Sequence, residues 1–341
     1  MTVNSKPCYV IAEIGVNHNG SLDLARQLID AAVLAKADAV KFQTFFADDL
    51  VTKSAAKADY QIANTENADS QYSMLKALEL TEAQFAELRD YCIGAGIEFL
   101  STPFSEAAAD LLERIGVTAY KVSSGDLTHL PLLAHLGRKG LPIILSSGMG
   151  NLSDVEEAIS AITATGNCQI SVLHCVSNYP AAAEDCNLAA MDTLARAFGL
   201  PVGWSDHTMG PAISWAAVAR GAKIIEKHIT LSRDLPGPDH VASMEPGEFA
   251  EFVTGIRAIE AAIGTGHKAP TAAEKRTALV GRRSIIAARA LTAGEVLRAE
   301  DVKIKRPGSG LAPKYLDLVI GTRLARDVAA DTPLVRDDFH A

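Results

Sequence analysis

Cysteine, basic charge and long apolar runs are all scarce in this sequence. Its five cysteines, Cys8, Cys92, Cys168, Cys175 and Cys186, are odd in number and never form a C-x-x-C pair. Scattered cysteines of this kind favour free thiols in a reducing compartment over a disulfide framework. The net charge of −9 argues against non-specific nucleic-acid binding, which depends on basic surfaces. A local cationic pocket for a small anion is still compatible with this balance.

Membrane-spanning and secretory segments are also missing. No apolar stretch approaches the ~20 residues needed to cross a bilayer. Residues 1–10, MTVNSKPCYV, lack the basic and apolar regions of a signal peptide. We therefore expect a cytoplasmic protein with no membrane partner. The chain has 341 residues, which is enough for one large domain and one small domain.

The sequence is rich in one repeated alternation of two patterns. Short apolar or β-branched runs occupy residues 9–15, 39–44, 98–103, 119–125, 142–148, 170–176, 201–207 and 223–230. Amphipathic segments with helical spacing lie between them, and several begin near Ser or Thr and end on Gly. Near-continuous apolar strands alternating with helices predict a parallel sheet covered on both faces. Eight such units in about 260 residues predict an α/β fold of the (β/α)8 or TIM-barrel type. A doubly wound open sheet is the alternative, although neither a Rossmann fingerprint nor a P-loop is present.

Two parts of the chain depart from this alternation. Residues 45–80 separate the second predicted strand from the next helix, and so long a connection favours a functional loop such as a lid. A surface excursion with some helix is the alternative. From Arg282 onwards the sequence changes to short β-type runs, Gly turns and Pro. We expect a barrel domain over residues 1–265, a linker over 266–281 and a compact β-rich module over 282–341.

Polar side chains lie at the end of every predicted strand. Active sites of (β/α)8 barrels are built at the carboxyl ends of the strands, so a full ring of such residues predicts a catalytic site better than it predicts helix caps. In strand order they are Glu13; Lys41 and Gln43; Ser101 and Thr102; Lys121, Ser123, Ser124 and Asp126; Ser146 and Ser147; His174, Ser177, Asn178 and Tyr179; Ser205, Asp206 and His207; and Glu226, Lys227 and His228.

Two histidines in this ring indicate a metal site. His207 and His228 end strands that are neighbours in a closed barrel, and two imidazoles at one rim suit a divalent cation with open coordination positions. Asp206 or Glu226 could orient an imidazole from behind. Two hydrogen-bonded histidines without metal are the alternative.

The lysines of the ring indicate an anion site. Lys41, Lys121 and Lys227, together with the serine and threonine hydroxyls, suit a phosphate or a carboxylate. A Schiff-base lysine is a competing interpretation, and for any single lysine a structural ion pair is the simplest one. Glu13 could act as a base or orient a water molecule.

Ten short motifs occur in a specific order along the chain. They are IAEIGVNHNG, VKFQT, FLSTPF, KVSSGDL, ILSSGM, LHCVSNYP, SDHT, EKHITL, PGPDHVASMEP and KRPGSG. Together they resemble the sialic acid synthase family, which includes the N-acetylneuraminate, legionaminate and pseudaminate synthases. The resemblance covers nearly the whole chain, and the order of the motifs is more specific than any one of them.

This resemblance implies a reaction. It is the metal-dependent condensation of phosphoenolpyruvate with open-chain N-acetylmannosamine and water, which gives a sialic acid and phosphate. The alternative is the same chemistry on a 2,4-diacetamido-2,4,6-trideoxy hexose, which gives legionaminate or pseudaminate. More distant alternatives are a Schiff-base aldolase and a carbohydrate-binding protein.

The resemblance also implies a cofactor and an assembly. The cation would be Mn2+, with Mg2+ or Co2+ as alternatives. The C-terminal module would be an antifreeze-like (SAF, β-clip) domain, which in a domain-swapped homodimer covers the barrel of the partner.

Individual positions match the site of that family. The metal ligands correspond to His207 and His228, and Glu13, Lys41 and Lys227 are expected to act in catalysis. Lys41 and Lys227 also match positions around phosphoenolpyruvate, with Thr102, Ser124, Ser146 and Ser205. Positions near the acceptor sugar are matched by Gln43, Tyr179 and Asp239, and Arg306 matches an arginine that reaches into the partner's site. Asp126, where relatives often carry Glu, is expected to contact substrate, while the roles of Ser177, Asn178 and Glu226 stay open.

Overall fold

The computed structural model describes residues 7–58, 61–62 and 70–340. The expectation for the N-terminus falls partly on residues 1–6, and that for the 45–80 loop falls partly on 59–60 and 63–69, all of which lie outside the described residues. The chain divides into two compact units, residues 1–265 and 266–341. Each unit is described by itself.

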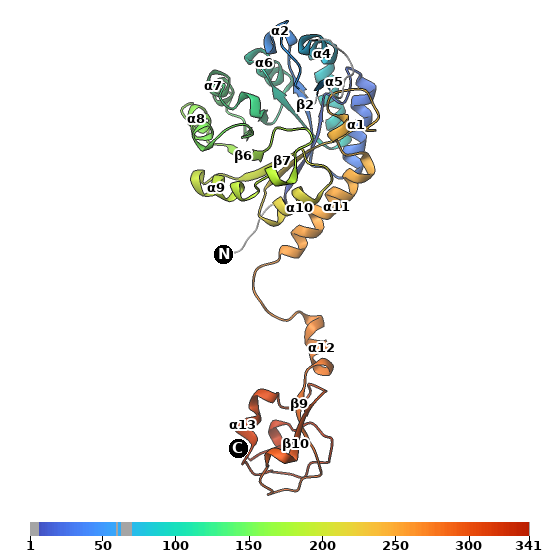
Figure 1. The fold of residues 1–341 in the computed structure, drawn as a ribbon, viewed down its shortest axis with the longest axis vertical. Helices are drawn as coiled ribbons and strands as arrows, with labels where there is room; N and C mark the ends of the chain where they lie inside the picture. Colours follow the sequence, from blue (N-terminus) through green and yellow to red (C-terminus); the bar gives the residue numbers. More distant parts are fainter. Residues whose placement is uncertain (1–6, 59–60, 63–69, 341) are drawn as a thin grey trace. The chain divides into compact units, whose positions relative to one another are not determined.

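Eight parallel strands form the centre of the first unit (Figure 1). They are β1 (Tyr9–Gly15), β2 (Ala39–Thr44), β3 (Glu98–Pro103), β4 (Tyr120–Val122), β5 (Ile143–Ser146), β6 (Ile170–Cys175), β7 (Val202–Asp206) and β8 (Ile224–His228). Their order is β3-β2-β1-β8-β7-β6-β5-β4, and β4 also lies beside β3. Each of the eight predicted runs therefore contains one strand, and the predicted (β/α)8 barrel is confirmed.

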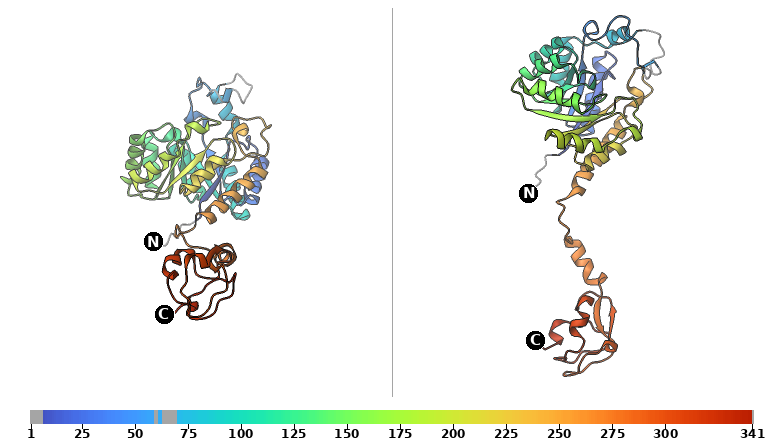
Figure 2. Two further views of the ribbon diagram at one scale, coloured as in Figure 1. Left: turned by 60° about the horizontal axis from the view of Figure 1, so that its bottom comes forward. Right: turned by 60° about the vertical axis from the view of Figure 1, so that its left-hand side comes forward.

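Helices cover the outside of this sheet, as both views in Figure 2 show. They are α1 (Leu22–Leu34), α5 (Glu82–Ala95), α6 (Glu106–Ile115), α7 (Leu130–Arg138), α8 (Leu152–Thr163), α9 (Ala189–Phe198), α10 (Ala212–Ala219) and α11 (Pro246–Ile263). The short α2 (Ala47–Leu50) and α4 (Gln71–Leu78) contact each other and lie at the carboxyl ends of the strands. Their ends follow the predicted signals. Side chains of Ser21, Thr81 and Ser105 accept backbone N–H bonds at helix starts, and Gly96 and Gly116 end helices with a left-handed backbone.

The apolar core has two layers. One lies between strands and helices and contains large side chains such as Phe85, Trp204 and Phe249. The other fills the barrel interior near the amino ends of the strands; its members are Ile11, Ala39, Leu100, Ala119, Ile144, Leu173 and Ile224. This inner plug fills the barrel interior at the amino ends of the strands. A site inside the barrel can therefore lie only at the carboxyl ends of the strands.

The second unit is small and has its own core. Helix α12 (Ala272–Gly281) is followed by β9 (Ser284–Ala287), which pairs antiparallel with β10 (Val302–Lys305), and by the short α13 (Leu316–Val319). Isolated bridges such as Leu291–Val328 join its loops. Buried side chains including Ile285, Leu297 and Leu334 pack inside it.

Membrane insertion through a helix finds no support in the fold. No helix in the described part of the chain combines the length and the apolar character needed to span a bilayer.

Candidate active site

A cavity of about 480 Å³ opens at the carboxyl ends of the barrel strands. All eight strands contribute to it, either from their last residues or from the residue that follows. The polar and titratable side chains in its lining are Glu13, Lys41, Gln43, Gln61, Gln71, Thr102, Lys121, Ser123, Ser124, Ser146, Cys175, Ser177, Tyr179, Ser205, His207, Glu226, His228 and Asp239. Members of the predicted ring from all eight strands thus converge in space, although not every member lines the cavity.

Strand alternation explains why these particular side chains point inward. Successive residues of a strand face opposite sides, so residues two apart share a face. On β8, Ile224 belongs to the inner apolar plug, and Glu226 and His228 continue the same inward row. On β2, Ala39 is followed in the same way by Lys41 and then by Gln43. The cavity floor is therefore the second inward layer of the barrel, directly above the plug.

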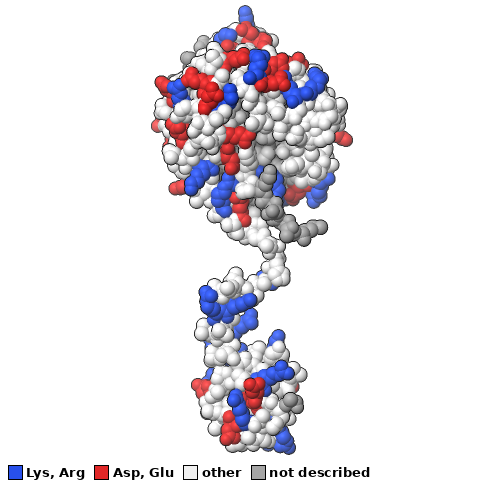
Figure 3. All heavy atoms as spheres, turned by 180° about the vertical axis from the view of Figure 1, so that it is seen from behind, with Lys and Arg blue, Asp and Glu red and all other residues white. Residues whose placement is uncertain are grey.

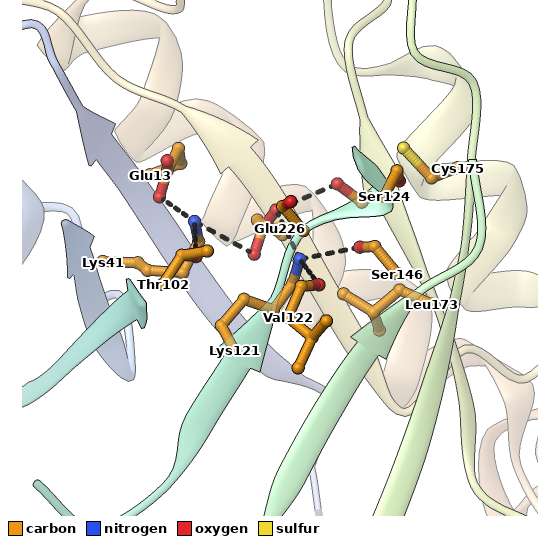
Figure 4. Close-up of polar contacts among 12 residues, drawn as sticks. Glu13, Lys41, Thr102, Lys121, Val122, Ser124, Ser146, Leu173, Cys175 and Glu226 are labelled. Carbon is orange, nitrogen blue, oxygen red and sulfur yellow. Dashed lines mark hydrogen bonds and ion pairs between the residues drawn. The ribbon is translucent and has the colours of Figure 1, made fainter. Parts of the chain in front are cut away.

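Lys41 lies at the centre of a buried charge network on this floor (Figure 4). Its Nζ is 2.7 Å from Glu13 Oε2 and 3.8 Å from Glu226 Oε2, and it donates to Thr102 Oγ1 at 3.1 Å. Gln43 Nε2 donates to the other oxygen of Glu13 at 3.1 Å. Strands β1, β2, β3 and β8 thus meet in one group of contacts.

Lys121 occupies the opposite side of the floor. Its Nζ donates to Ser146 Oγ at 2.7 Å and to the Val122 carbonyl at 3.1 Å, and it lies 3.6 Å from Glu226 Oε1. Ser205 Oγ donates to the same Glu226 oxygen at 2.9 Å. Glu226 consequently bridges the two ammonium groups, as the close-up shows.

Burial and pairing shift the pKa values of this network. Burial raises the pKa of Glu13 to about 7, although Lys41 opposes the shift. Burial also disfavours the charged form of Glu226, but Lys121 and Lys41 outweigh it and lower the pKa of Glu226 to about 2. Burial lowers the pKa of Lys121. Two carboxyl groups in one cavity with separated pKa values suit two roles, one as a fixed charge and one as a proton carrier near neutral pH.

Hydroxyl groups gather beside Lys121. Ser146, Ser124 and Ser177 line the same part of the cavity, and the Gly148 N–H donates to Ser124 Oγ at 3.0 Å. A side chain at Gly148 would collide with this group, because its Cβ would lie 2.3 Å from Ser177 Oγ and 2.7 Å from Ser124 Oγ. Glycine thus lets three hydroxyls and an ammonium group converge, which is a suitable arrangement for a phosphate.

The two histidines stand together at the rim of the cavity. Their ring centroids are 5.5 Å apart, and the Tyr179 ring lies 4.0 Å from that of His207. His207 Nδ1–H donates to the Val176 carbonyl at 2.8 Å, which leaves Nε2 unprotonated in the neutral ring. His228 Nδ1 is buried and has no hydrogen-bond partner in the described part of the chain; the Asp239 carboxylate is 3.9 Å away.

The described part of the 45–80 segment forms one wall of the cavity. Met74, Leu75 and Leu78 of α4 line it together with Val16 and Phe104 from the ends of β1 and β3, and these five residues pack as one apolar cluster. Gln61 and Gln71 add polar atoms to the same side. The cavity therefore has a charged floor and a largely apolar wall.

The structure corrects one of the expected site residues. Lys227 does not line the cavity; it is 1% exposed, its Nζ is 3.0 Å from Asp206 Oδ2, and it donates to the Thr208 carbonyl at 2.6 Å. The physical reason is strand alternation, since Lys227 lies between the inward-facing Glu226 and His228. Lys227 therefore does not reach the cavity where the substrate anion is expected, and Lys121 is the lysine that faces it together with Lys41.

Several other residues of the predicted ring lie outside the cavity lining, namely Ser101, Asp126, Ser147, His174, Asn178 and Asp206. Asp126 lies in the short 3-10 turn Ser124–Asp126 and accepts a hydrogen bond from Ser123 Oγ at 2.7 Å, outside the cavity lining. Arg306 belongs to the second unit, so its relation to the barrel stays a prediction.

Sequence reasoning gave too little weight to three residues that the structure brings to the floor. Lys121, Cys175 and Glu226 each lie two positions after an inward apolar residue, namely Ala119, Leu173 and Ile224. This spacing is a signal that the sequence does contain. It can be used only once the inward face of each strand is known.

The molecule is thus a (β/α)8 barrel with a charged, hydroxyl-rich cavity at the carboxyl ends of its strands and a pair of histidines at the rim of that cavity. The chain belongs to the NeuB family, whose model matches residues 28–268, and residues 282–340 match the SAF domain.

Two relatives and one solved structure are similar over most of the chain. The N,N'-diacetyllegionaminic acid synthase of Legionella pneumophila is 45% identical over 99% of this chain and 96% of its own. The synthase of the same name from Campylobacter jejuni is 41% identical over 97% of this chain and 100% of its own. A crystal structure of the N-acetylneuraminic acid synthetase of Leptospira borgpetersenii in complex with citrate superimposes with a TM-score of 0.71 at 35% identity, covering 80% of this chain and 90% of the other.

Proposed function

We propose that this protein condenses phosphoenolpyruvate with an open-chain N-acetylated amino sugar and water, releasing phosphate and a nonulosonic acid. The observation that carries the proposal is the cavity floor, where Lys41, Lys121 and a group of serine hydroxyls lie beside His207 and His228. Phosphoenolpyruvate carries a phosphate and a carboxylate, and these are the two groups that such a floor can bind. Membership in the NeuB family supports the same reaction.

The histidine pair fits a divalent cation. Burial and the nearby His207 and Lys41 lower the pKa of His228 well below its usual range, so its ring is neutral at pH 7 and its unpartnered Nδ1 can act as a ligand. His207 is oriented by its bond to the Val176 carbonyl, a common arrangement behind a metal-binding imidazole. In the described part of the chain no group of three or more His, Cys, Asp and Glu residues is arranged to hold a metal. With only two side-chain ligands, His207 and His228 would hold the ion, preferably Mn2+, with its other positions open to substrate and water; when bound it would supply Lewis-acid polarisation of the sugar aldehyde.

The remaining steps are assigned to side chains of the floor. Lys121, Ser124 and Ser146 hold the phosphate, and Lys41 with Thr102 holds the carboxylate, which directs C3 of the enol towards the sugar aldehyde. Bond formation between C3 and C1 of the sugar leaves positive charge at C2. The ionised Glu226 stabilises this charge, and water adds to C2.

Glu13 is the proton acceptor of the last steps. With a pKa near neutrality it can take a proton from the water that adds to C2. The resulting tetrahedral carbon expels phosphate, which takes the proton of the C2 hydroxyl as the ketone at C2 forms, and the proton held by Glu13 passes to the alkoxide that the aldehyde oxygen became when C3 bonded to C1. Because Glu13 also pairs with Lys41, the proton it takes weakens this pair, and the charge of Lys41 is then directed to the carboxylate that it holds.

We expect the rate to depend on pH through Glu13. Its raised pKa of about 7 means that the basic form is lost as the pH falls through neutrality. The kcat/KM for the acceptor sugar should therefore fall about tenfold per pH unit below pH 7 and be level above it. Glu13→Gln should be slow but should have lost this acidic limb. A Glu13→Gln enzyme that keeps the wild-type limb would assign the titration to another group.

The acceptor is proposed to be a 2,4-diacetamido-2,4,6-trideoxy hexose, with N-acetylmannosamine as the second candidate. The wall formed by Val16, Met74, Leu75, Leu78 and Phe104 suits the methyl groups of a 6-deoxy carbon and a second acetamido group better than it suits two hydroxyls. Both relatives described above are named for the diacetyl product. Burying each methyl-sized group stabilises binding by about 0.8 kcal/mol.

Phosphate release from phosphoenolpyruvate, measured with each sugar in turn, tests the proposal. We expect acceptor-dependent release with both sugars and a kcat/KM about tenfold higher for the diacetamido sugar, as two buried methyl groups imply. A higher value for N-acetylmannosamine would reverse the choice of acceptor. No release with either sugar, or a borohydride-trapped pyruvate adduct on Lys121, would favour the Schiff-base alternative.

The second unit is proposed to act on the barrel of a partner in a homodimer, with Arg306 reaching the acceptor sugar. The two units carry opposite charge: residues 266–341 contain 14 Lys and Arg against 9 Asp and Glu, whereas residues 1–265 contain 18 against 32. Figure 3 shows lysine and arginine side chains gathered around α12. Opposite charges favour association of one copy with another. We therefore expect the mass of a dimer by sedimentation at low salt, and the mass of a monomer would contradict the proposed homodimer.

A further inference from the structure

The connection between β8 and α11 brings a carboxylate to the cavity. Residues 229–245 leave β8, pass Pro238 and Asp239, which line the cavity, and return to a parallel bridge between Ile229 and Met244. In the described part of the chain no hydrogen bond reaches the Asp239 carboxylate, which is 3.9 Å from His228 Nδ1. The position of this side chain must therefore be set through its backbone.

A relay of hydrogen bonds fixes that backbone from the loop after β1. Asn17 Nδ2 donates to Ser243 Oγ at 2.9 Å, and Ser243 Oγ donates to the Asp239 carbonyl at 2.6 Å. The Asn17 amide also donates to the Ile229 carbonyl at 2.8 Å. A carbonyl can only accept, so this bond fixes the orientation of the amide. Both Asn17 and Ser243 are 1% exposed.

Neighbouring contacts hold the same connection at two more points. Asn19 Nδ2 donates to the Pro236 carbonyl at 2.9 Å. His240 Nδ1 bonds to Thr230 Oγ1 at 2.7 Å. Gly237 has a φ of +151° and passes so close to His240 that a Cβ there would lie 2.7 Å from the ring. The NHNG stretch that begins at Asn17 is thus used to clasp the β8–α11 connection.

We propose that Asn17 and Ser243 are positioning residues for the acceptor sugar, acting through Asp239. This inference rests on the proposed function, in which the sugar aldehyde lies at His207 and His228; Asp239 lines the cavity beside His228 and is therefore placed to contact the acceptor. Neither residue lines the cavity, so their effect has to pass through the backbone of Asp239. A carboxylate without hydrogen bonds of its own stays in place only if the segment carrying it is held.

The test compares Asn17→Ala and Ser243→Ala with Asn167→Ala. Asn167 is a matched control: it is also a buried asparagine, its amide donates to the Leu141 carbonyl at 2.8 Å, and it precedes β6 at the opposite end of the barrel. We expect both relay variants to raise the KM for the acceptor sugar about tenfold and to change the KM for phosphoenolpyruvate less than twofold. Asn167→Ala should leave both values unchanged.

Combination with Asp239→Asn identifies the route of the effect. If Asn17 acts through Asp239, then Asn17→Ala should add less than about twofold to the sugar KM of an Asp239→Asn enzyme. If the rise in the sugar KM of the double variant equals the product of the rises in the two single variants, Asn17 does not act through Asp239. Ser243→Thr, which keeps the hydroxyl, should restore most of the affinity lost in Ser243→Ala.

Amide hydrogen exchange of residues 236–244 separates the failure of this inference from failure of the proposed reaction. Asn17→Ala should speed exchange there about tenfold, and Asn167→Ala should not. Faster exchange with a wild-type sugar KM would overturn the positioning role, as would unchanged exchange. If the wild-type protein releases no phosphate with either sugar, the proposed reaction fails, and the exchange result alone decides whether the relay holds the connection.

Discussion

Replacing His228 with alanine, or removing divalent cations from the protein, is expected to lower acceptor-dependent phosphate release about 1000-fold. In the described part of the chain, His228 Nδ1 is buried without a hydrogen-bond partner, and its pKa is well below its usual range, so the neutral ring has a free lone pair that the proposed cation would use. Loss of Lewis-acid assistance costs several kcal/mol, which corresponds to a factor of this size. Phosphate release should be measured after verified metal removal and again after Mn2+ is added back.

His174 provides a matched control for this experiment. It is also a histidine on a barrel strand, but its ring packs 5.1 Å from that of Trp204 and bonds to the Cys186 carbonyl, away from the cavity. His174→Gln should keep the metal requirement and bind Mn2+ with wild-type affinity by calorimetry, whereas His228→Ala should show weakened binding. Full activity of the metal-free protein would refute the metal assignment.

Lys121→Met is expected to lose activity, whereas Lys227→Met is expected to lose stability. Lys121 faces the cavity and should be needed for the phosphate, so its loss should lower kcat/KM for phosphoenolpyruvate by about 100-fold or more, as expected for a buried charged contact. Lys227 is paired with Asp206 outside the cavity. Its loss leaves a buried carboxylate unpaired, which should lower the free energy of unfolding by about 3 kcal/mol and leave the KM for phosphoenolpyruvate unchanged.

A double variant tests whether the stability lost in Lys227→Met comes from the unpaired Asp206 carboxylate. Asp206→Asn combined with Lys227→Met removes both charges and should recover part of the lost stability, measured by urea denaturation. A large rise in the KM for phosphoenolpyruvate in Lys227→Met, with Lys121→Met close to wild type, would show that the assignment of the two lysines is reversed.

The architecture of the barrel was predictable because its signals are local. Each strand from β1 to β8 is a short apolar run. The segments between the strands have apolar residues at helical spacing and capping residues at their ends. Alternation of this kind follows from a two-residue period for strands and a 3.6-residue period for helices, and both can be followed along a single chain. The concentration of polar residues at strand ends was visible for the same reason.

The contacts inside the site were not predictable in this way. Glu226 on β8 reaches Lys41 on β2 and Lys121 on β4, and these strands are separated in the barrel as well as in the sequence. Spacing along the chain gives no distance across the interior of a closed sheet. The clasp between Asn17 and Ser243 likewise joins positions 226 residues apart.

The sequence by itself determined the eight βα units, the polar ring at the strand ends and the ordered motifs that place the chain in its family. Only the tertiary structure decided which members of the ring share the cavity. The EKH run at the end of β8 illustrates both: its chemistry is plain from the sequence, but Glu226 and His228 face the interior while Lys227 faces Asp206. The reason is the pleat of the strand, which assigns neighbouring side chains to opposite faces, together with barrel closure, which decides what each face meets.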